Sequence, residues 1–148
     1  MSIWWSLHLR REAASVPLAR RLLIGTMETA GVDPDISYDL SVALSEACAN
    51  AVEHGGDAAS GTSEAYRVTA YLDGEKCRIE VTDSGPGLAL GHEVRPARPD
   101  AEHGRGLCLI RELADHVHIG VKPGRGTGTV VSFDKLLKWK KDPSLLTA

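Results

Sequence analysis

Residues 40–54 read Leu-Ser-Val-Ala-Leu-Ser-Glu-Ala-Cys-Ala-Asn-Ala-Val-Glu-His, and this stretch decides the fold. It contains neither Gly nor Pro, and its apolar side chains recur at the spacing of one helix face. The recurring apolar residues are Leu40, Ala43, Leu44, Ala47 and Ala51. Glu46 and Asn50 are four residues apart, so both can face one ligand. A carboxylate can accept a proton, and an amide oxygen suits Mg²⁺.

The composition indicates a single globular domain over residues 1–148. Hydrophobic residues make up 43% and charged residues 25% of the chain. The net charge of -3 gives no support to a protein that neutralises nucleic-acid phosphates, so we expect no direct nucleic-acid partner. The three cysteines are far apart and form no CxxC pair, which argues against a disulfide framework or a zinc site. No apolar stretch is long enough to cross a bilayer and no signal pattern is present, so we expect a cytoplasmic protein without a membrane partner.

Periodicity and turn residues predict eight elements. They are a strand at 3–10, a helix at 16–29, a helix that starts near 33–35 and ends before Gly55-Gly56, strands at 66–72 and 77–82, a helix at 105–114, and strands at 116–121 and 129–133. Ser15 is the expected N-cap of the first helix, and Gly31 is expected to close it. Asp73-Gly74 predicts a tight hairpin between two strands. From about residue 135 we expect a basic, flexible tail.

This element order predicts an α+β fold. Helices would cover one face of a mostly antiparallel, mixed sheet, which gives a two-layer α/β sandwich.

Three glycine-containing blocks follow the central helix and carry the remaining chemistry. Asp83-Ser-Gly-Pro-Gly follows a strand directly, and a carboxylate there can accept a hydrogen bond from an exocyclic amine. Gly85 and Gly87 let the backbone approach a flat ring. Residues 104–106, Gly-Arg-Gly, open a helix whose N–H groups can bind an anion. The last block, Gly-Arg-Gly-Thr-Gly-Thr at 124–129, leads into the final strand.

Together the four blocks resemble the N, G1, G2 and G3 boxes of the GHKL ATPase superfamily. The segments that start at Ser45, Asp83 and Gly104 are most similar to those of the anti-sigma-factor serine kinases, the SpoIIAB/RsbW group. The resemblance covers about residues 5–133 and implies the Bergerat ATP-binding fold.

The resemblance also implies roles for particular residues. Asn50 would hold Mg²⁺, Glu46 would be the general base, and Asp83 would bind the adenine amino group. The residues implied to bind ATP are Asn50, Asp83, Gly85, Gly87, Gly104, Arg105, Gly106, Leu107, Thr127 and Thr129. Arg105 would in addition support catalysis by its charge. The doubled Gly-Thr leaves open whether Thr129 or Thr127 bonds near the adenine or Asp83.

The resemblance therefore implies an ATP-dependent protein-serine/threonine kinase that acts as an anti-sigma factor, with ATP and Mg²⁺ as cofactors. Its usual partners are a STAS-domain anti-anti-sigma protein and an RNA polymerase sigma factor, and such kinases are commonly homodimers. The alternative is a GHKL module that binds a nucleotide or a partner without catalysis. A sensor histidine kinase is disfavoured because no phosphoacceptor helix pair precedes the domain.

Overall fold

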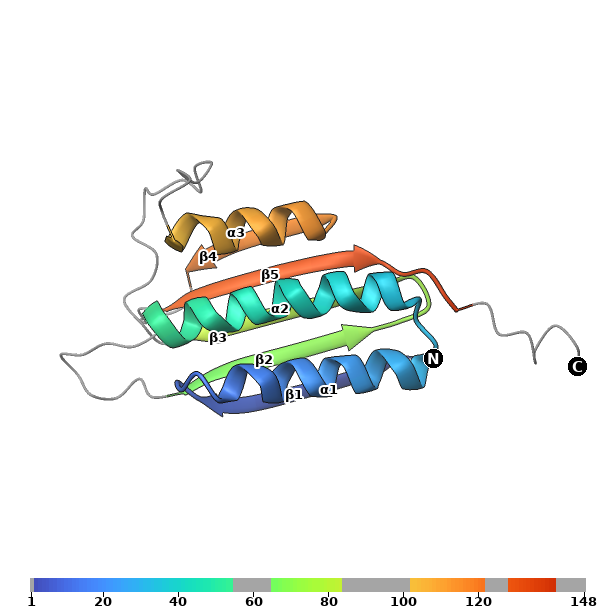
Figure 1. Ribbon diagram of the computed structural model, residues 1–148, viewed down its shortest axis with the longest axis horizontal. Helices are drawn as coiled ribbons and strands as arrows, with labels where there is room; N and C mark the ends of the chain where they lie inside the picture. Colours follow the sequence, from blue (N-terminus) through green and yellow to red (C-terminus); the bar gives the residue numbers. More distant parts are fainter. Residues whose placement is uncertain (1, 55–64, 84–101, 122–127, 141–148) are drawn as a thin grey trace, which may run out of the picture.

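The computed structural model of the chain describes residues 2–54, 65–83, 102–121 and 128–140 (Figure 1). The elements in chain order are β1 (Ile3–Arg10), α1 (Ser15–Ala30), α2 (Pro34–His54), β2 (Ala65–Leu72), β3 (Lys76–Asp83), α3 (Glu102–Leu113), β4 (His116–Val121) and β5 (Thr129–Leu136). The predicted order of strands and helices is confirmed. The predicted lengths differ at α3, which begins three residues earlier, and at β5, which ends three residues later.

The strands form one sheet in the order β1-β2-β3-β5-β4, and every described pairing is antiparallel. The three helices lie side by side on one face of this sheet, with α2 in the middle (Figure 1). The predicted two-layer α+β sandwich is therefore confirmed, and the described part of the sheet contains no parallel pair.

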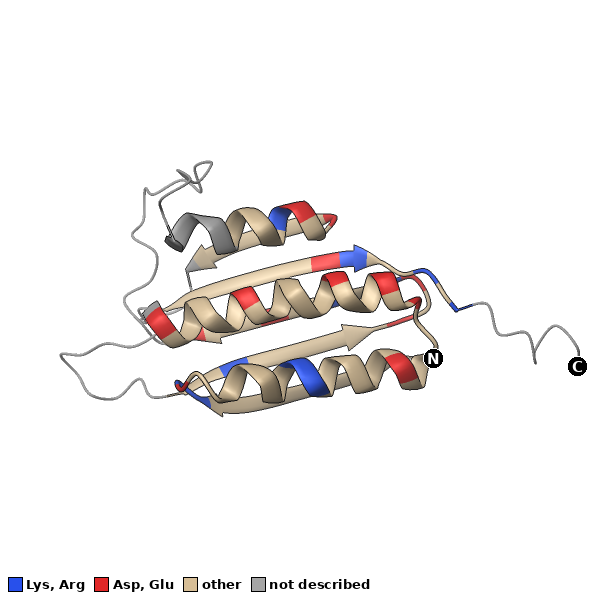
Figure 2. Cartoon of the chain, viewed as in Figure 1, with Lys and Arg blue, Asp and Glu red and all other residues tan. Residues whose placement is uncertain are grey.

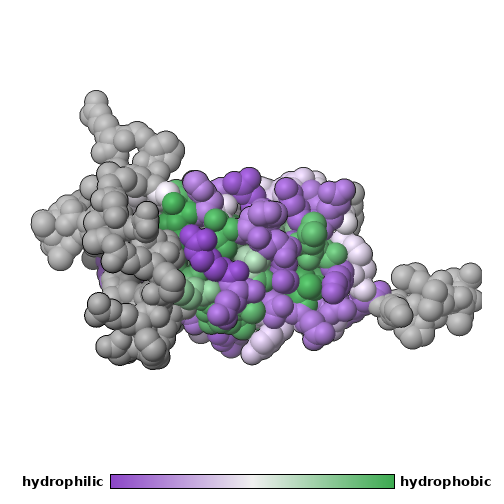
Figure 3. All heavy atoms as spheres, turned by 90° about the horizontal axis from the view of Figure 1, so that it is seen from above, coloured by the Kyte–Doolittle hydropathy of each residue, from purple (hydrophilic) through white to green (hydrophobic). Residues whose placement is uncertain are grey.

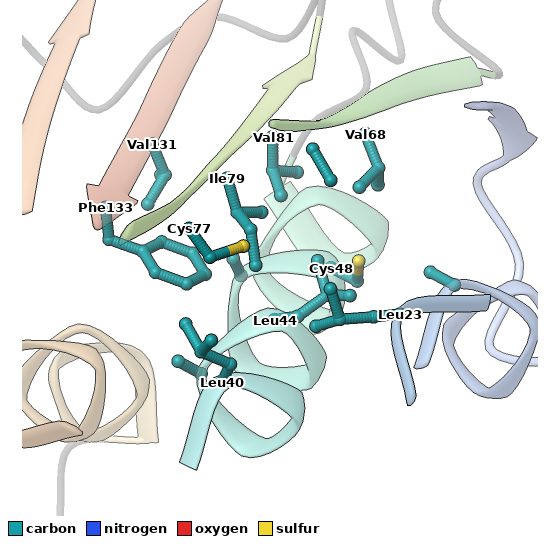
Figure 4. Packing of buried hydrophobic residues seen from close by; sticks show 14 of the residues in the cluster. Leu23, Leu40, Leu44, Cys48, Val68, Cys77, Ile79, Val81, Val131 and Phe133 are labelled. Carbon is teal, nitrogen blue, oxygen red and sulfur yellow. The ribbon is translucent and has the colours of Figure 1, made fainter. Parts of the chain in front are cut away.

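The core lies between α2 and the sheet (Figure 4). All five apolar positions predicted for the inner face of α2 are at most 2% exposed. Opposite them, Ile79 pairs with Phe133 and Val81 pairs with Val131, so the inward side chains of β3 and β5 stand next to each other. These contacts fix the rotation of α2 about its own axis and hence the direction in which its remaining side chains point.

The two ends of α1 are formed differently from each other. Gly31 ends the helix in a left-handed conformation (φ 83°), as its sequence position predicts. Ser15, in contrast, is not the N-cap: Ala14 occupies that position and makes no capping hydrogen bond. The Ser15 hydroxyl donates instead to the Glu12 carbonyl and lies 2.5 Å from the Tyr66 hydroxyl, because a buried phenol requires a hydrogen-bond partner.

The chain from residue 135 to residue 140 follows the fold. Lys135 and Leu136 complete β5 opposite Cys77 and Lys76. Beyond them, Trp139 forms a β-bridge with Val32, in the connection between α1 and α2. Residues 141–148 lie outside the described residues. The tail expected from about residue 135 is thus part of the fold as far as residue 140.

Among the described residues, no helix is long and apolar enough to span a membrane. Seen from above the view of Figure 1, hydrophobic residues lie in patches among hydrophilic ones (Figure 3).

Candidate functional site

Asp83 and Thr129 meet where β3 ends and β5 begins. The Thr129 backbone N–H donates to Asp83 Oδ1 at 3.2 Å. Both residues are buried, and Asp83 is only 9% exposed. A carboxylate is costly to bury unless it accepts hydrogen bonds from its surroundings. The antiparallel pairing of the two strands therefore builds a buried acceptor at this edge of the sheet.

Glu46 and Asn50 lie one turn apart on α2, and both are half-buried. They lie on the side of the helix away from Cys48, which points into the core. About 100° separates successive residues of an α-helix, so Glu46 and Asn50 both fall roughly 160–200° from Cys48. The structure thus keeps the two polar residues on one face, as their spacing predicts.

α3 begins at Glu102, so Gly104, Arg105 and Gly106 belong to its first turns. The prediction that the helix begins at Arg105 is therefore wrong by three residues. In a helix whose first residue is Glu102, the N–H groups without a partner in the helix end at Gly104, because the Arg105 N–H already makes an i→i−4 bond. Of residues 104–106, Gly104 therefore keeps an N–H that the helix leaves available for an anion. Leu107, the next residue, is buried in the core.

These parts come together at one end of the molecule. In Figure 1 the end of α2, the end of β3, the start of α3 and the start of β5 lie at the same end of the sandwich. Gly85, Gly87 and Thr127 lie outside the described residues, as does the side chain of Arg105. Within the described ranges, no group of three or more His, Cys, Asp or Glu side chains is arranged to hold a metal ion.

A buried polar chain lies behind α2, on the side away from Glu46 and Asn50. The Ser15 hydroxyl donates a hydrogen bond to the Glu12 carbonyl, so its oxygen accepts one from the Tyr66 hydroxyl. Tyr66 in turn hydrogen-bonds Cys48. Burial raises the pKa of Cys48 to about 12 and that of Tyr66 to about 12. Both groups are therefore neutral at physiological pH, so this row of hydrogen-bonded side chains is structural and supplies no nucleophile.

Three side chains make long-range contacts that hold the helices and that no local sequence pattern predicts. Arg11 donates from Nε to the Val52 carbonyl of α2 at 2.9 Å. Lys135 donates from Nζ to the carbonyl of Leu113, which is the last residue of α3, at 2.7 Å. Tyr66 holds the polar chain behind α2. Their contacts are all long-range, and the only sequence signal was that Tyr66 falls on the inward face of a strand.

The fold, with its polar groups at one end of the sandwich, agrees with that of a histidine kinase-like ATPase domain. The family described by that name matches residues 9–135, and the chain belongs to it.

Within this family the chain is similar to the serine-protein kinase RsbW of Bacillus licheniformis, with 33% identity over 132 residues, 82% of this chain and 78% of that protein. It is also similar to the anti-sigma F factor of a Thermoanaerobacter species, with 30% identity over 105 residues, 66% of this chain and 71% of that protein. The predicted membership in the anti-sigma-factor kinase group of the GHKL ATPases is confirmed.

Among solved structures, the RsbU and RsbW domains of a Mycobacterium tuberculosis protein have a similar fold. The TM-score is 0.64 at 23% identity, and the match covers 90% of this chain and 33% of that one. This likeness supports the fold.

Proposed function

We propose that the chain is an ATP-dependent protein-serine/threonine kinase that acts as an anti-sigma factor. In this proposal it phosphorylates a STAS-domain anti-anti-sigma protein, sequesters an RNA polymerase sigma factor and works in the cytoplasm as a homodimer. Similarity to proteins named serine-protein kinase RsbW and anti-sigma F factor supports the proposal. The observation that carries it is the buried Asp83–Thr129 pair at the end of the sandwich where α2 also ends, one turn beyond Asn50.

The described residues fit an adenine nucleotide. Asp83 is a buried acceptor, and an exocyclic amine is a donor that such an acceptor can recognise. The first turns of α3 offer N–H groups to phosphates, and Arg105 adds positive charge. Gly85, Gly87 and Gly106 would let the backbone approach the nucleotide closely, and Thr129 or Thr127 would bond near the base.

Asn50 would hold Mg²⁺ through its amide oxygen, and the bound ion neutralises phosphate charge. Glu46 would orient the serine hydroxyl and take up its proton. The new bond joins the serine oxygen to the γ-phosphorus, and the bond between that phosphorus and ADP breaks. Phosphoryl transfer depends on positioning and charge neutralisation more than on covalent help. In this proposal Mg²⁺, Glu46 and the groups at the start of α3 would provide both.

The test is transfer of radiolabelled γ-phosphate from ATP, with Mg²⁺, to STAS-domain proteins of the same genome. The proposal expects one of them to be labelled on Ser or Thr. Glu46→Gln keeps the shape of the side chain and should bind ATP normally while losing transfer by about 100-fold or more, the range typical for a general base. If the wild-type chain binds ATP and labels none of these proteins, the kinase proposal is refuted and the domain is a nucleotide- or partner-binding module.

A further inference from the structure

The C-terminal end of α2 carries an unfavourable charge. The last four carbonyl groups of a helix have no partner within it, and this end of the helix dipole is negative. The charged residues of α2 are all acidic, as Figure 2 shows in red, and Glu53 lies in the last turn. A cation from another element would therefore stabilise this end.

Arg11 is that cation. It follows β1 directly and donates from Nε to the Val52 carbonyl at 2.9 Å, across 41 positions of sequence. Val52 is two residues beyond Asn50 and carries one of the last four carbonyls of the helix. The guanidinium group thus provides both a hydrogen-bond donor and a positive charge at the negative end of the α2 dipole.

The segment that carries Arg11 is itself held in place. The Glu12 N–H donates to the Arg10 carbonyl at 2.8 Å, and the Ser15 N–H donates to the Glu12 carbonyl at 3.0 Å. The Ser15 hydroxyl adds a second bond to the same Glu12 carbonyl. Arg11 therefore extends from a fixed corner of the backbone, and its hydrogen bond can transmit that position to α2.

A second contact holds α2 from the same side. Tyr66, bonded to Ser15 of this corner, hydrogen-bonds Cys48. Cys48 and Val52 are four residues apart and lie on the same side of the helix, whereas Asn50 lies on the opposite side. α2 is thus held on the face away from Asn50 at two residues, Cys48 before it and Val52 after it in the sequence.

We propose that Arg11 is a positioning residue for the nucleotide site. From the connection between β1 and α1 it donates a hydrogen bond to the Val52 carbonyl, and this contact sets the position of Asn50 and Glu46. This inference rests on the proposed function, because it concerns how the same site binds Mg²⁺ and ATP. Arg11 acts through α2 and is not itself a catalytic residue.

The experiment compares Arg11→Ala with Arg10→Ala by calorimetric titration with ATP, with and without Mg²⁺. Arg10 is a matched control, because it is exposed and its described ion pair, with Glu12, is 3.9 Å long. We expect Arg11→Ala to weaken Mg²⁺–ATP binding about tenfold, the lower bound typical for residues that orient a metal ligand. ATP binding without Mg²⁺ should change less, and Arg10→Ala should leave both affinities within about twofold, as expected for an exposed pair. Arg11→Lys, which keeps the charge and a donor, should recover part of the loss.

A second readout does not depend on the nucleotide. Amide hydrogen exchange in the last turn of α2 should be faster in Arg11→Ala than in Arg10→Ala, because the last turn loses its partner. Equal exchange in the two variants contradicts the contact itself. Equal Mg²⁺–ATP affinities, or a loss that is the same with and without Mg²⁺, overturn the positioning role. A wild-type chain that fails to bind ATP refutes the proposed function first, and this is visible before any variant is compared.

Discussion

The buried carboxylate of Asp83 offers the sharpest single test of how the site recognises a base. Asp83→Asn has nearly the same shape, and its amide oxygen can still accept the Thr129 N–H that now lies 3.2 Å from Oδ1. The substitution removes the charge and turns one acceptor oxygen into an NH₂ donor. Adenine presents a donor amine at its six position and guanine presents an acceptor oxygen there, so the two bases should respond in opposite directions.

The magnitude follows from the burial of the group. A hydrogen bond to a charged partner contributes about 1.5–3 kcal/mol, so losing it should weaken ATP binding about 10- to 150-fold. GTP should bind no worse, and the preference of the wild-type chain for ATP over GTP should shrink by at least that factor. Competition of ATP and GTP for the site, followed by calorimetry on wild type and Asp83→Asn, measures both affinities.

Stability separates this effect from unfolding. Asp83→Asn should retain most of the thermal stability, since the Thr129 contact survives. Asp83→Ala should lose about 1–3 kcal/mol, because it leaves a buried N–H without that acceptor. If Asp83→Asn binds ATP as tightly as the wild type and keeps the same ATP-to-GTP ratio, then Asp83 does not read the base and the reasoning is wrong.

Three further predictions follow from other parts of the structure. Asn50→Ala should remove the gain in ATP affinity that Mg²⁺ gives while leaving the melting temperature unchanged, and an unaltered response to Mg²⁺ in calorimetry would exclude Asn50 as the ligand. Lys135→Met should destabilise the fold by about 1–3 kcal/mol in urea denaturation, because a 15% exposed ammonium leaves the end of α3, whereas the exposed Lys138→Met should be neutral. Burial raises the pKa of the Cys48 thiol from 9.0 to about 12, so its contribution to stability is complete below pH 9 and is lost as the pH rises towards 12; alkaline denaturation of Cys48→Ala should therefore depend less steeply on pH.

Local patterns were sufficient to predict the order of the elements. The stripe of apolar residues in 40–54 predicted the buried face of α2, and the alternation on each side of Asp73-Gly74 predicted the β2–β3 hairpin. Both signals arise from residues close in sequence, where the helix and strand periods act directly. Glu46 and Asn50 were found for the same reason, since their spacing alone puts them on one face.

What could not be predicted depends on partners far along the chain. β5 extends beyond residue 133 because Asp134 and Lys135 pair with Arg78 and Cys77 of β3, and this register determines that Lys135 points inward although its side chain is charged. Nothing local distinguishes Arg11 from Arg10, although only Arg11 is shown donating to α2. Ser is a residue type that commonly caps helices, but at Ser15 the tertiary contact with Tyr66 overrides that local preference.

The measurement that tests the account most directly is a calorimetric titration of the wild-type chain with ATP in the presence and absence of Mg²⁺. We expect saturable binding of one ATP per chain that is tighter with Mg²⁺, because Asn50 would hold the ion and the α3 N-terminus would hold the phosphates. Absence of ATP binding under both conditions would contradict it.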